Sequence, residues 1–278
     1  MNMPADITED VLAALTGAPS GDADVLRDVL RKAFREADGP TRTRLRKVLP
    51  PSEVTFSGVQ MYVDPRDNYT DLRIWLDGQP PEMTCLGALL DRVRGRNALV
   101  LDIGANSGAY TVPLAAAAGS GSRVIAFEPN PAMIGRLGGN VTLNGLGQRV
   151  RIEGCALGDE AGEAVLHLKA NNYGEASFTR LKPRQRSGAV LVPVRSILEF
   201  VGEAQGHDVS VLKIDVEGFE VQALGPLLDA GGWLPDVILV ETAHARKWEV
   251  DLTAVIRGLG YAVALEADGN TLFERGAA

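Results

Sequence analysis

The chain has 278 residues, of which 45% are hydrophobic and 23% are charged, and its formal net charge is −8 at pH 7. These values are typical of a globular protein, and the length allows one or two domains with a full hydrophobic core. The acidic balance argues against a nucleic-acid partner, because no basic field would gather phosphates. The most apolar stretch, residues 109–119, is too short to cross a membrane.

The cysteines and the N-terminus bear on the cellular compartment. Cys85 and Cys155 have neither the spacing of a metal site nor that of a disulfide scaffold, so a reducing interior is expected. Residues 1–10 are acidic and lack the apolar core of a signal peptide. We therefore predict a cytoplasmic protein with no membrane partner. Whether it forms a homo-oligomer is left open.

Residues 1–50 predict a helical extension. Apolar residues lie on one helical face over 11–15, and glycine and proline then break the pattern over 17–21. Helical spacing of apolar residues resumes from 22 to 37. We expect two helical pieces ahead of the main domain.

Residues 51–95 predict a β lead-in followed by a helix. Apolar residues alternate with polar ones through 54–63 and again over 72–76, and this alternation predicts strands. A helix is predicted over 81–93. We expect this lead-in to pack on the core of the main domain, residues 96–278.

The main domain begins with a strand, a tight turn and a helix. Apolar residues 98–101 run into Asp102, the glycine-bearing turn 104–108 follows, and residues 110–118 predict a helix. This is the first half of a βαβ nucleotide-binding unit. The glycines are needed because the backbone bends sharply there and must let a ligand approach closely.

A second strand, residues 123–127, ends in Glu128, about 20 residues beyond the turn as in dinucleotide-binding folds. A carboxylate there can accept both hydroxyl protons of a ribose. The glycines themselves do not match the dinucleotide fingerprint, which would need glycine at the positions of Asn106 and Ala109. The turn therefore favours a ligand other than a dinucleotide.

S-adenosylmethionine (SAM) suits this turn better. SAM has no phosphate, and it carries a sulfonium, an ammonium and a carboxylate. An acid at Asp102 and a side-chain amide at Asn106 fit that mixture better than they fit a pyrophosphate, which prefers bare backbone N–H groups at a helix N-terminus. We favour SAM over NAD as the cofactor.

The middle of the chain continues the alternation of helices and strands. A helix is predicted from Pro131 to about Val141, and a third strand covers 149–155. In this type of fold the loop after the third strand lies against the adenine, so Cys155 and Ala156 are predicted there. A long insertion over 171–187 is the best candidate for a lid that faces the substrate.

Two further buried strands also end in acids. One runs into Asp215 and is followed by Glu217, where a helix is predicted to begin, and the other ends in Glu241 with His244 just beyond. Ligands of open α/β sheets bind outside the carboxyl ends of the strands. Four strand-ending carboxylates are therefore predicted to share one rim: Asp102, Glu128, Asp215 and Glu241.

The chain resembles the FkbM family of SAM-dependent methyltransferases. The resemblance covers about residues 96–245 and rests on four motifs that occur in order and at matching spacing: Leu101-Asp-Ile-Gly-Ala-Asn-Ser-Gly108, Ala126-Phe-Glu-Pro129, Asn140-Val-Thr-Leu-Asn144 and Lys213-Ile-Asp-Val-Glu-Gly-Phe-Glu220.

The resemblance implies an α/β fold of the class I methyltransferase (Rossmann-like) type, with a mainly parallel sheet. A C-terminal antiparallel hairpin is expected over 261–273, in addition to the N-terminal extension. The implied function is O-methylation of a sugar or a natural-product hydroxyl. The residues predicted to bind SAM are Asp102, Gly104, Asn106, Gly108, Tyr110, Glu128, Cys155 and Ala156.

Methyl transfer is an in-line displacement that also requires a hydroxyl acceptor to lose a proton. Candidate catalytic residues for that proton are Asp215, Glu217, Glu241 and His244. Asp215 and Glu241 could instead hold Mg²⁺, which prefers oxygen ligands.

Two alternatives stay open at this point. One is an NAD(P)-dependent oxidoreductase on the same sheet, and the other is a non-catalytic nucleotide-binding module.

Overall fold

The computed structural model describes residues 23–170, 172–178 and 186–276. The predicted helical piece over 11–15 lies outside the described residues. The fold is built on a sheet of seven strands in the described part of the chain, with the order β5–β4–β3–β9–β10–β12–β11. Its strands are β3 (Ala98–Ile103), β4 (Arg123–Phe127), β5 (Val150–Glu153), β9 (Val209–Ile214), β10 (Val237–Glu241), β11 (Tyr261–Ala267) and β12 (Asn270–Arg275).

The pairing confirms a mainly parallel sheet with a C-terminal antiparallel hairpin. Strands β5, β4, β3, β9 and β10 pair in parallel. Strand β12 pairs antiparallel with both β10 and β11. The order reverses between β3 and β9, because β4 and β5 extend the sheet on one side and the later strands extend it on the other. Ligands of open α/β sheets bind at such a switch point.

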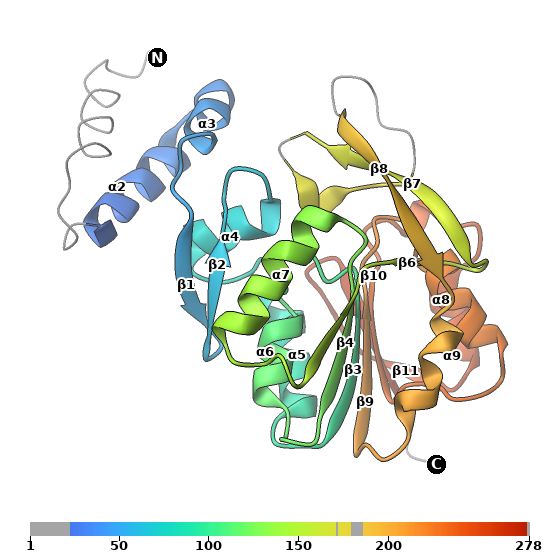
Figure 1. Cartoon of the computed structure of the whole chain (residues 1–278). Coiled ribbons are helices and arrows are strands. Elements are labelled where there is room, and N and C mark those ends of the chain that lie inside the picture. Colours follow the sequence, from blue (N-terminus) through green and yellow to red (C-terminus); the bar gives the residue numbers. More distant parts are fainter. Residues whose placement is uncertain (1–22, 171, 179–185, 277–278) are drawn as a thin grey trace.

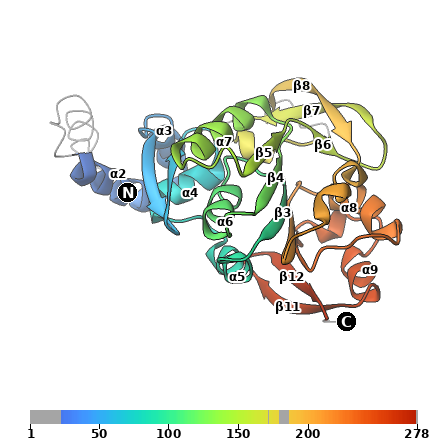
Figure 2. The same cartoon turned by 60° about the horizontal axis from the view of Figure 1, so that its bottom comes forward.

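Helices cover both faces of the sheet (Figures 1 and 2). Two buried apolar clusters lie on opposite sides of the strands, one under each layer of helices. The first layer holds α5 (Met83–Val93), α6 (Thr111–Ala117) and α7 (Pro131–Leu143). The second holds α8 (Glu220–Asp229), α9 (Leu252–Gly258) and the 3-10 turn η3 (Ile197–Glu199). No described helix is long and apolar enough to span a membrane.

Smaller elements flank these layers. The three-stranded sheet β6–β8–β7 stands above the carboxyl ends of the main strands (Figure 1). Its strands are β6 (Ala156–Leu157), β7 (Gly162–Lys169) and β8 (Arg186–Arg195). The remaining 3-10 turns are η1 (Tyr173–Glu175), η4 (Val201–Ala204) and η5 (Ala245–Lys247).

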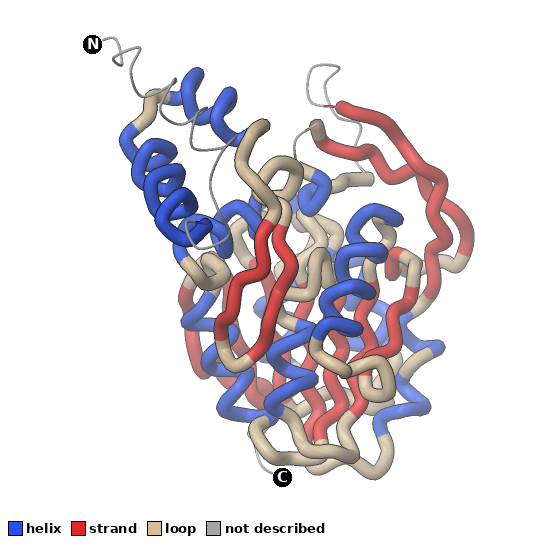
Figure 3. The backbone as a smooth tube through the Cα atoms, turned by 60° about the vertical axis from the view of Figure 1, so that its left-hand side comes forward, coloured by secondary structure: helices blue, strands red, loops and turns tan. Residues whose placement is uncertain are grey.

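The lead-in packs on the outer side of α7. It comprises the hairpin of β1 (Ser52–Phe56) and β2 (Val59–Val63), then α4 (Tyr69–Asp77), and it ends with α5 in the first helix layer. The described part of the helical extension, α2 (Ala23–Glu36) and α3 (Gly39–Arg46), precedes it. Figure 3 shows the hairpin standing beside the helices that cover the sheet. Its buried side chains join the same apolar cluster as those of β3 and α6.

The prediction of a strand over 72–76 is wrong, because these residues belong to helix α4. The Asn68 side chain caps the helix by accepting a hydrogen bond from the backbone N–H of Asp71 (3.1 Å), and Gly78 ends it with φ +73°. Leu72, Ile74, Trp75 and Leu76 are all buried. Since the helix is buried on several sides, its apolar residues do not follow the spacing of a one-sided helix.

Two asparagine side chains take the place of a neighbouring strand at the edge of β2. Asn144 exchanges hydrogen bonds with the backbone of Gln60 (2.9 and 2.6 Å), and Asn140 does so with Tyr62 (2.7 and 3.2 Å). Asn140 and Asn144 lie one turn apart on α7, and residues 60 and 62 present the same strand edge. The motif Asn140-Val-Thr-Leu-Asn144 thus attaches the lead-in to the main domain.

Candidate active site

A cavity of about 330 Å³ opens where the main strands end. Along this rim Cys155 lies just beyond β5, Glu128 follows β4, Gly104 follows β3, Asp215 follows β9, and Glu241 ends β10. The cavity is of the size that small-molecule sites usually have. Its walls include nine of the predicted site residues: Gly104, Asn106, Glu128, Cys155, Ala156, Asp215, Glu217, Glu241 and His244.

The glycine turn at the end of β3 is shaped by close packing. Gly104 has φ +79°, and a Cβ on it would collide with the carbonyl oxygen of Asp215. Gly108 has φ +97°, and a Cβ there would press on Leu137. Gly108 does not line the cavity, so its glycine serves packing, and its predicted contact with SAM stays a prediction.

Asn106 forms the centre of the turn, in a left-handed conformation with φ +53°. Its side-chain Oδ1 accepts hydrogen bonds from the Asn68 amide (2.5 Å) and from the backbone N–H of Ser107 (2.8 Å). Its backbone N–H donates to Glu128 Oε2 (2.8 Å). The amide predicted to bind SAM therefore also holds the turn in place.

Glu128 presents its carboxylate to the cavity from the end of β4. Its second oxygen, Oε1, accepts the backbone N–H of Asn130 (2.8 Å). Burial raises the pKa of Glu128 to about 7, against the two backbone hydrogen bonds, which lower it. A carboxylate oriented in this way can accept further hydrogen bonds from the hydroxyls of a ribose.

Asp102 lies beneath the cavity and does not line it, and its predicted contact with SAM stays a prediction. It is fully buried and accepts a hydrogen bond from Thr111 Oγ1 (2.5 Å). Lys213 Nζ stands 3.5 Å from Asp102 and donates to the carbonyl oxygen of Gly104 (2.9 Å). Asp102 thus supports the turn through Lys213.

Tyr110 is also absent from the cavity wall. Its ring lies under the Lys213 ammonium, which is 5.4 Å from the ring centroid. Tyr110 therefore belongs to the layer below the cavity, together with Asp102 and Lys213, and not to the surface that a ligand touches.

The segment after β9 holds Glu217 in a strained conformation. Glu217 has φ +59°, which is uncommon for a residue other than glycine, and Gly218 follows with φ +104°. Glu220 Oε1 accepts the backbone N–H groups of Val216 and Gly218 (both 3.1 Å). The prediction that α8 begins at Glu217 is wrong, because the helix begins at Glu220. The turn directs Glu217 into the cavity.

Glu241, His244 and Glu217 form a cluster of titratable groups. His244 Nδ1 lies 2.9 Å from Glu241 Oε2, and His244 Nε2 lies 3.8 Å from Glu217 Oε2. Burial, and then the charge of Asp215, raises the pKa of Glu217 to about 7 and that of Glu241 to about 8. Perturbed groups of this kind in a cleft are typical of functional sites.

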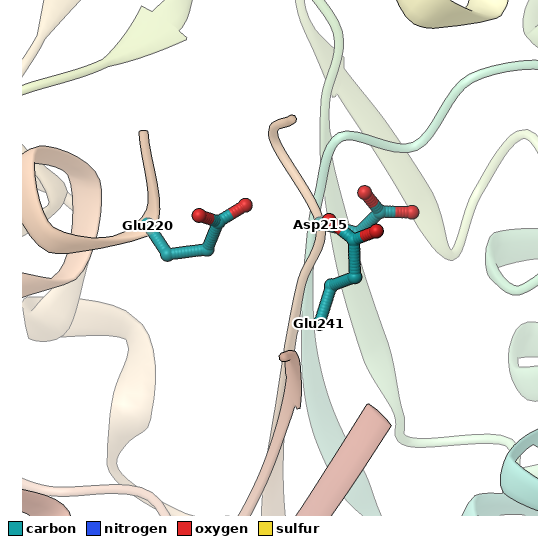
Figure 4. Close-up of side chains that lie close together, drawn as sticks. All are labelled: Asp215, Glu220 and Glu241. Carbon is teal, nitrogen blue, oxygen red and sulfur yellow. The ribbon is translucent and has the colours of Figure 1, made fainter. Parts of the chain in front are cut away.

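The donor set does not favour the predicted Mg²⁺ site. Asp215, Glu241 and Glu220 each place one carboxylate oxygen within 4.8 Å of the others, close enough to share an ion, and Figure 4 shows the carboxylate of Glu241 beside that of Asp215. Glu220 is already engaged, because its Oε2 accepts the Trp248 indole N–H (2.7 Å) in addition to the two backbone bonds at Oε1. Glu241 likewise faces His244. We derive no catalytic step through a metal.

Part of the predicted lid lines the cavity, namely Asn172, Gly174–Ala176 and Phe178. The backbone N–H of Tyr173 donates to the carbonyl oxygen of Asp67 (2.6 Å), and the backbone N–H of Tyr69 donates to Asn172 Oδ1 (2.9 Å). Asn130 also donates to the carbonyl oxygen of Tyr173 (2.9 Å). Of the predicted lid, residues 171 and 179–185 lie outside the described residues, and 186–187 belong to β8.

Several wall residues carry no signal in the sequence. Tyr69 and Glu82 come from the lead-in, far from the motifs along the chain. Phe178 and Phe219 form an edge-to-face pair with ring centroids 5.3 Å apart, although they lie on separate segments. Only the folded chain brings these side chains together.

The sequence of the chain is similar to those of known methyltransferases. The model of the methyltransferase FkbM domain matches residues 102–263. "Methyltransferase 1" of Beauveria bassiana is 27% identical over 187 residues, which is 61% of this chain and 74% of that protein.

Two solved methyltransferase structures are also similar to this chain. One is methyltransferase FkbM from Methylobacillus flagellatus, with 18% identity and a TM-score of 0.43 over 91% of this chain and 60% of that chain. The other is precorrin-6y C5,15-methyltransferase from Geobacter metallireducens, with 12% identity and a TM-score of 0.40 over 66% of this chain and 74% of that chain. Since the family model spans more than half of the sequence, the chain belongs to the FkbM-domain family of SAM-dependent methyltransferases.

Proposed function

We propose that this methyltransferase transfers the methyl group of SAM to a hydroxyl of a small acceptor, a sugar or a hydroxylated natural product. The observation that carries the proposal is the His244–Glu241 pair, which lies in the same cavity as the glycine turn. A hydroxyl acceptor must lose a proton as it is methylated, and a histidine oriented by a carboxylate is suited to take it.

The pair fixes the roles of the two ring nitrogens. When His244 Nδ1–H donates to Glu241, Nε2 is left as the acceptor for the hydroxyl proton. The imidazolium that forms is stabilised by Glu241 on one side and by Glu217, 3.8 Å from Nε2, on the other. Bound SAM supplies the methyl group on a sulfonium that leaves as a neutral thioether.

The residues on the cavity wall fit SAM. The carboxylate of Glu128 could accept hydrogen bonds from a ribose diol. The acids Asp215, Glu217 and Glu241 on the wall would favour the positive charge of the sulfonium. Cys155, Ala156, Leu157 and Leu166 form an apolar wall suited to an adenine ring. The predicted contacts of SAM with Gly104, Asn106, Glu128, Cys155 and Ala156 are kept as part of this proposal.

The acceptor side is lined by acids and by the Phe178–Phe219 pair. Aromatic rings pack well against the apolar faces of sugar-like molecules, while carboxylates accept hydrogen bonds from hydroxyls. With a net charge of −8, the chain is further proposed to act on a small molecule and not on nucleic acid. Its cytoplasmic placement is kept as a proposal, supported by two buried free thiols, Cys85 and Cys155.

The test is methyl transfer from isotope-labelled SAM to a panel of polyhydroxylated acceptors, with the product linkage assigned by NMR. His244→Asn is expected to lower kcat by roughly 10²- to 10⁴-fold, the usual contribution of a general base, while the affinity for SAM stays unchanged. His207→Asn is the control, because His207 contacts Asn97 and does not line the cavity. A methyl product on nitrogen, or full turnover in His244→Asn, would refute the proposal.

A further inference from the structure

Glu82 is a carboxylate at the start of a helix that does not cap the helix. It occupies the N-cap position of α5, yet its side chain makes no capping hydrogen bond. Asp268, from the hairpin turn between β11 and β12, does this instead: its Oδ2 accepts the backbone N–H groups of Thr84 (3.1 Å) and Cys85 (3.3 Å). The Glu82 carboxylate is therefore not used for capping, and it lines the cavity with the Tyr110 hydroxyl beside it.

The hairpin also fixes the position of Glu82. Cys85 Sγ donates to the carbonyl oxygen of Ala267 (3.3 Å), so the first turn of α5 is tied to the hairpin at two points. Glu82 forms no salt bridge with any described residue. The charge of Lys213 acts on Glu82, but the Lys213 ammonium is shared by Asp102 (3.5 Å), Asp215 (3.8 Å) and the Gly104 carbonyl oxygen (2.9 Å).

The order of the strands determines how SAM must lie in the cavity. Along the rim, the apolar wall at Cys155 and Ala156 follows β5, Glu128 follows β4, and Gly104 and Asp215 follow β3 and β9. Adenine fits the apolar end, and the ribose fits Glu128. The amino-acid end of SAM would then lie toward Gly104 and Asp215, and Glu82 lines the cavity near Asp215, whose charge acts on it.

We propose that Glu82 binds the α-ammonium group of SAM and so positions the cofactor from the lead-in, outside the span that the family model matches. The ammonium carries three donors, and Glu82 is a carboxylate near Asp215 without a cationic partner of its own. Burial, together with the charge of Asp215, raises the pKa of Glu82, although Lys213 and the Tyr110 hydroxyl act in the opposite direction. A bound ammonium would further stabilise the charged form of Glu82.

The inference rests on SAM dependence and not on the nature of the acceptor. Two probes separate the amino-acid end from the rest of the cofactor. S-adenosylhomocysteine (SAH) keeps the ammonium, whereas 5′-methylthioadenosine keeps the adenine, ribose and thioether and lacks the whole amino-acid end. Calorimetric titration of both probes into the full chain and into Glu82→Gln measures the contribution of the carboxylate.

Glu82→Gln is expected to weaken SAH binding roughly ten- to hundredfold, as for loss of a charge-assisted hydrogen bond, and to leave 5′-methylthioadenosine within about twofold. Glu266→Gln, an exposed carboxylate on β11, is the control and should change neither affinity. The Tm of unliganded Glu82→Gln should be equal to or higher than that of the wild type, because a carboxylate that repels Asp215 has been removed.

Unchanged SAH affinity in Glu82→Gln would overturn the inference, and so would an equal loss for both probes together with a lower Tm, which would indicate a structural role. The outcome is distinguishable from failure of the proposed function. A difference between the two probes without any O-methyl product would leave Glu82 in its role and refute only the acceptor chemistry.

Discussion

At the scale of single residues, Glu217 of the motif 213–220 is held in a strained backbone conformation that places its carboxylate near the proposed base, His244. A non-glycine residue at φ +59° costs of order 1 kcal/mol or more, and such strain persists only where neighbours enforce it. Here Glu220 holds the turn through two backbone N–H groups, and Lys247 Nζ approaches the Glu217 carbonyl oxygen (3.4 Å). The result is a carboxylate held beside His244.

The pH dependence of turnover tests this cluster. The proposed base, His244, works when its partner Glu241 is charged and can accept the Nδ1–H hydrogen bond. The pKa of Glu241 is raised to about 8 and that of the neighbouring Glu217 to about 7. We therefore expect kcat to rise with pH between about 6 and 8. Glu217→Gln removes a negative charge next to Glu241, so the pKa of Glu241 falls and the acidic limb of the profile shifts to lower pH. An acidic limb that moves to higher pH in Glu217→Gln would contradict this account.

At the scale of elements, Asn140 and Asn144, here called the asparagine ladder, couple the lead-in to the glycine turn 104–108. Both Asn140 and Asn144 pair with β2, but only Asn140 also donates to the carbonyl oxygen of Ser107 in the turn (2.9 Å). Asn144 instead donates its second hydrogen bond to the carbonyl oxygen of Asn140 in its own helix (2.8 Å). The two residues are therefore a matched pair for separating stability from cofactor binding.

Replacing each asparagine by aspartate keeps its shape and removes its donors. Asn144→Asp should lower the free energy of unfolding by about 1–3 kcal/mol, the cost of unsatisfied carbonyl groups, and leave SAM affinity unchanged. Asn140→Asp should lower both, because the turn also loses a bond. Urea unfolding and calorimetric titration measure the two effects. Equal SAM affinities in the two variants would show that the ladder does not act on the turn.

Most of the core strands could be predicted from the sequence, whereas helix α4 and the role of Glu82 could not. The strand–acid pattern at Asp102, Glu128, Asp215 and Glu241 predicted the core strands and most of the rim, because buried parallel strands are continuous apolar runs. The α4 helix was missed since it is buried on several sides. Glu82 was missed because its role depends on Asp268, which lies 186 positions later in the sequence and takes over the capping of α5.

At the scale of the whole molecule, several buried carboxyl groups have raised pKa values, so their charged forms destabilise the folded chain. Burial raises the pKa of Glu128 and Glu217 to about 7 and that of Glu241 to about 8, and these three line the cavity. Burial also raises the pKa of Asp71, which does not line the cavity, to about 6. Between their unfolded and folded pKa values, the folded chain binds more protons than the unfolded chain. The contribution of these four carboxyls to stability therefore falls as the pH rises through that window.

We expect the Tm of the unliganded protein to fall as pH rises from about 5 to 8, and the fall to be smaller in Glu217→Gln. Carboxylates whose pKa is lowered, such as Asp64 and Glu203, change the stability only at lower pH, where they take up protons. They therefore do not cancel this fall in Tm. Thermal unfolding across this range, at constant ionic strength, is the measurement. A Tm that rises steadily up to pH 8 would contradict the charge balance described for the cavity.

The most direct test of the central claim is a calorimetric titration of the whole chain with SAM and, separately, with NADH. The account predicts that SAM binds at one site, that Glu128→Gln weakens this binding at least about tenfold through the lost charge-assisted hydrogen bonds to the ribose, and that NADH gives no binding heat. Binding of NADH, or SAM affinity that is unchanged in Glu128→Gln, would contradict it.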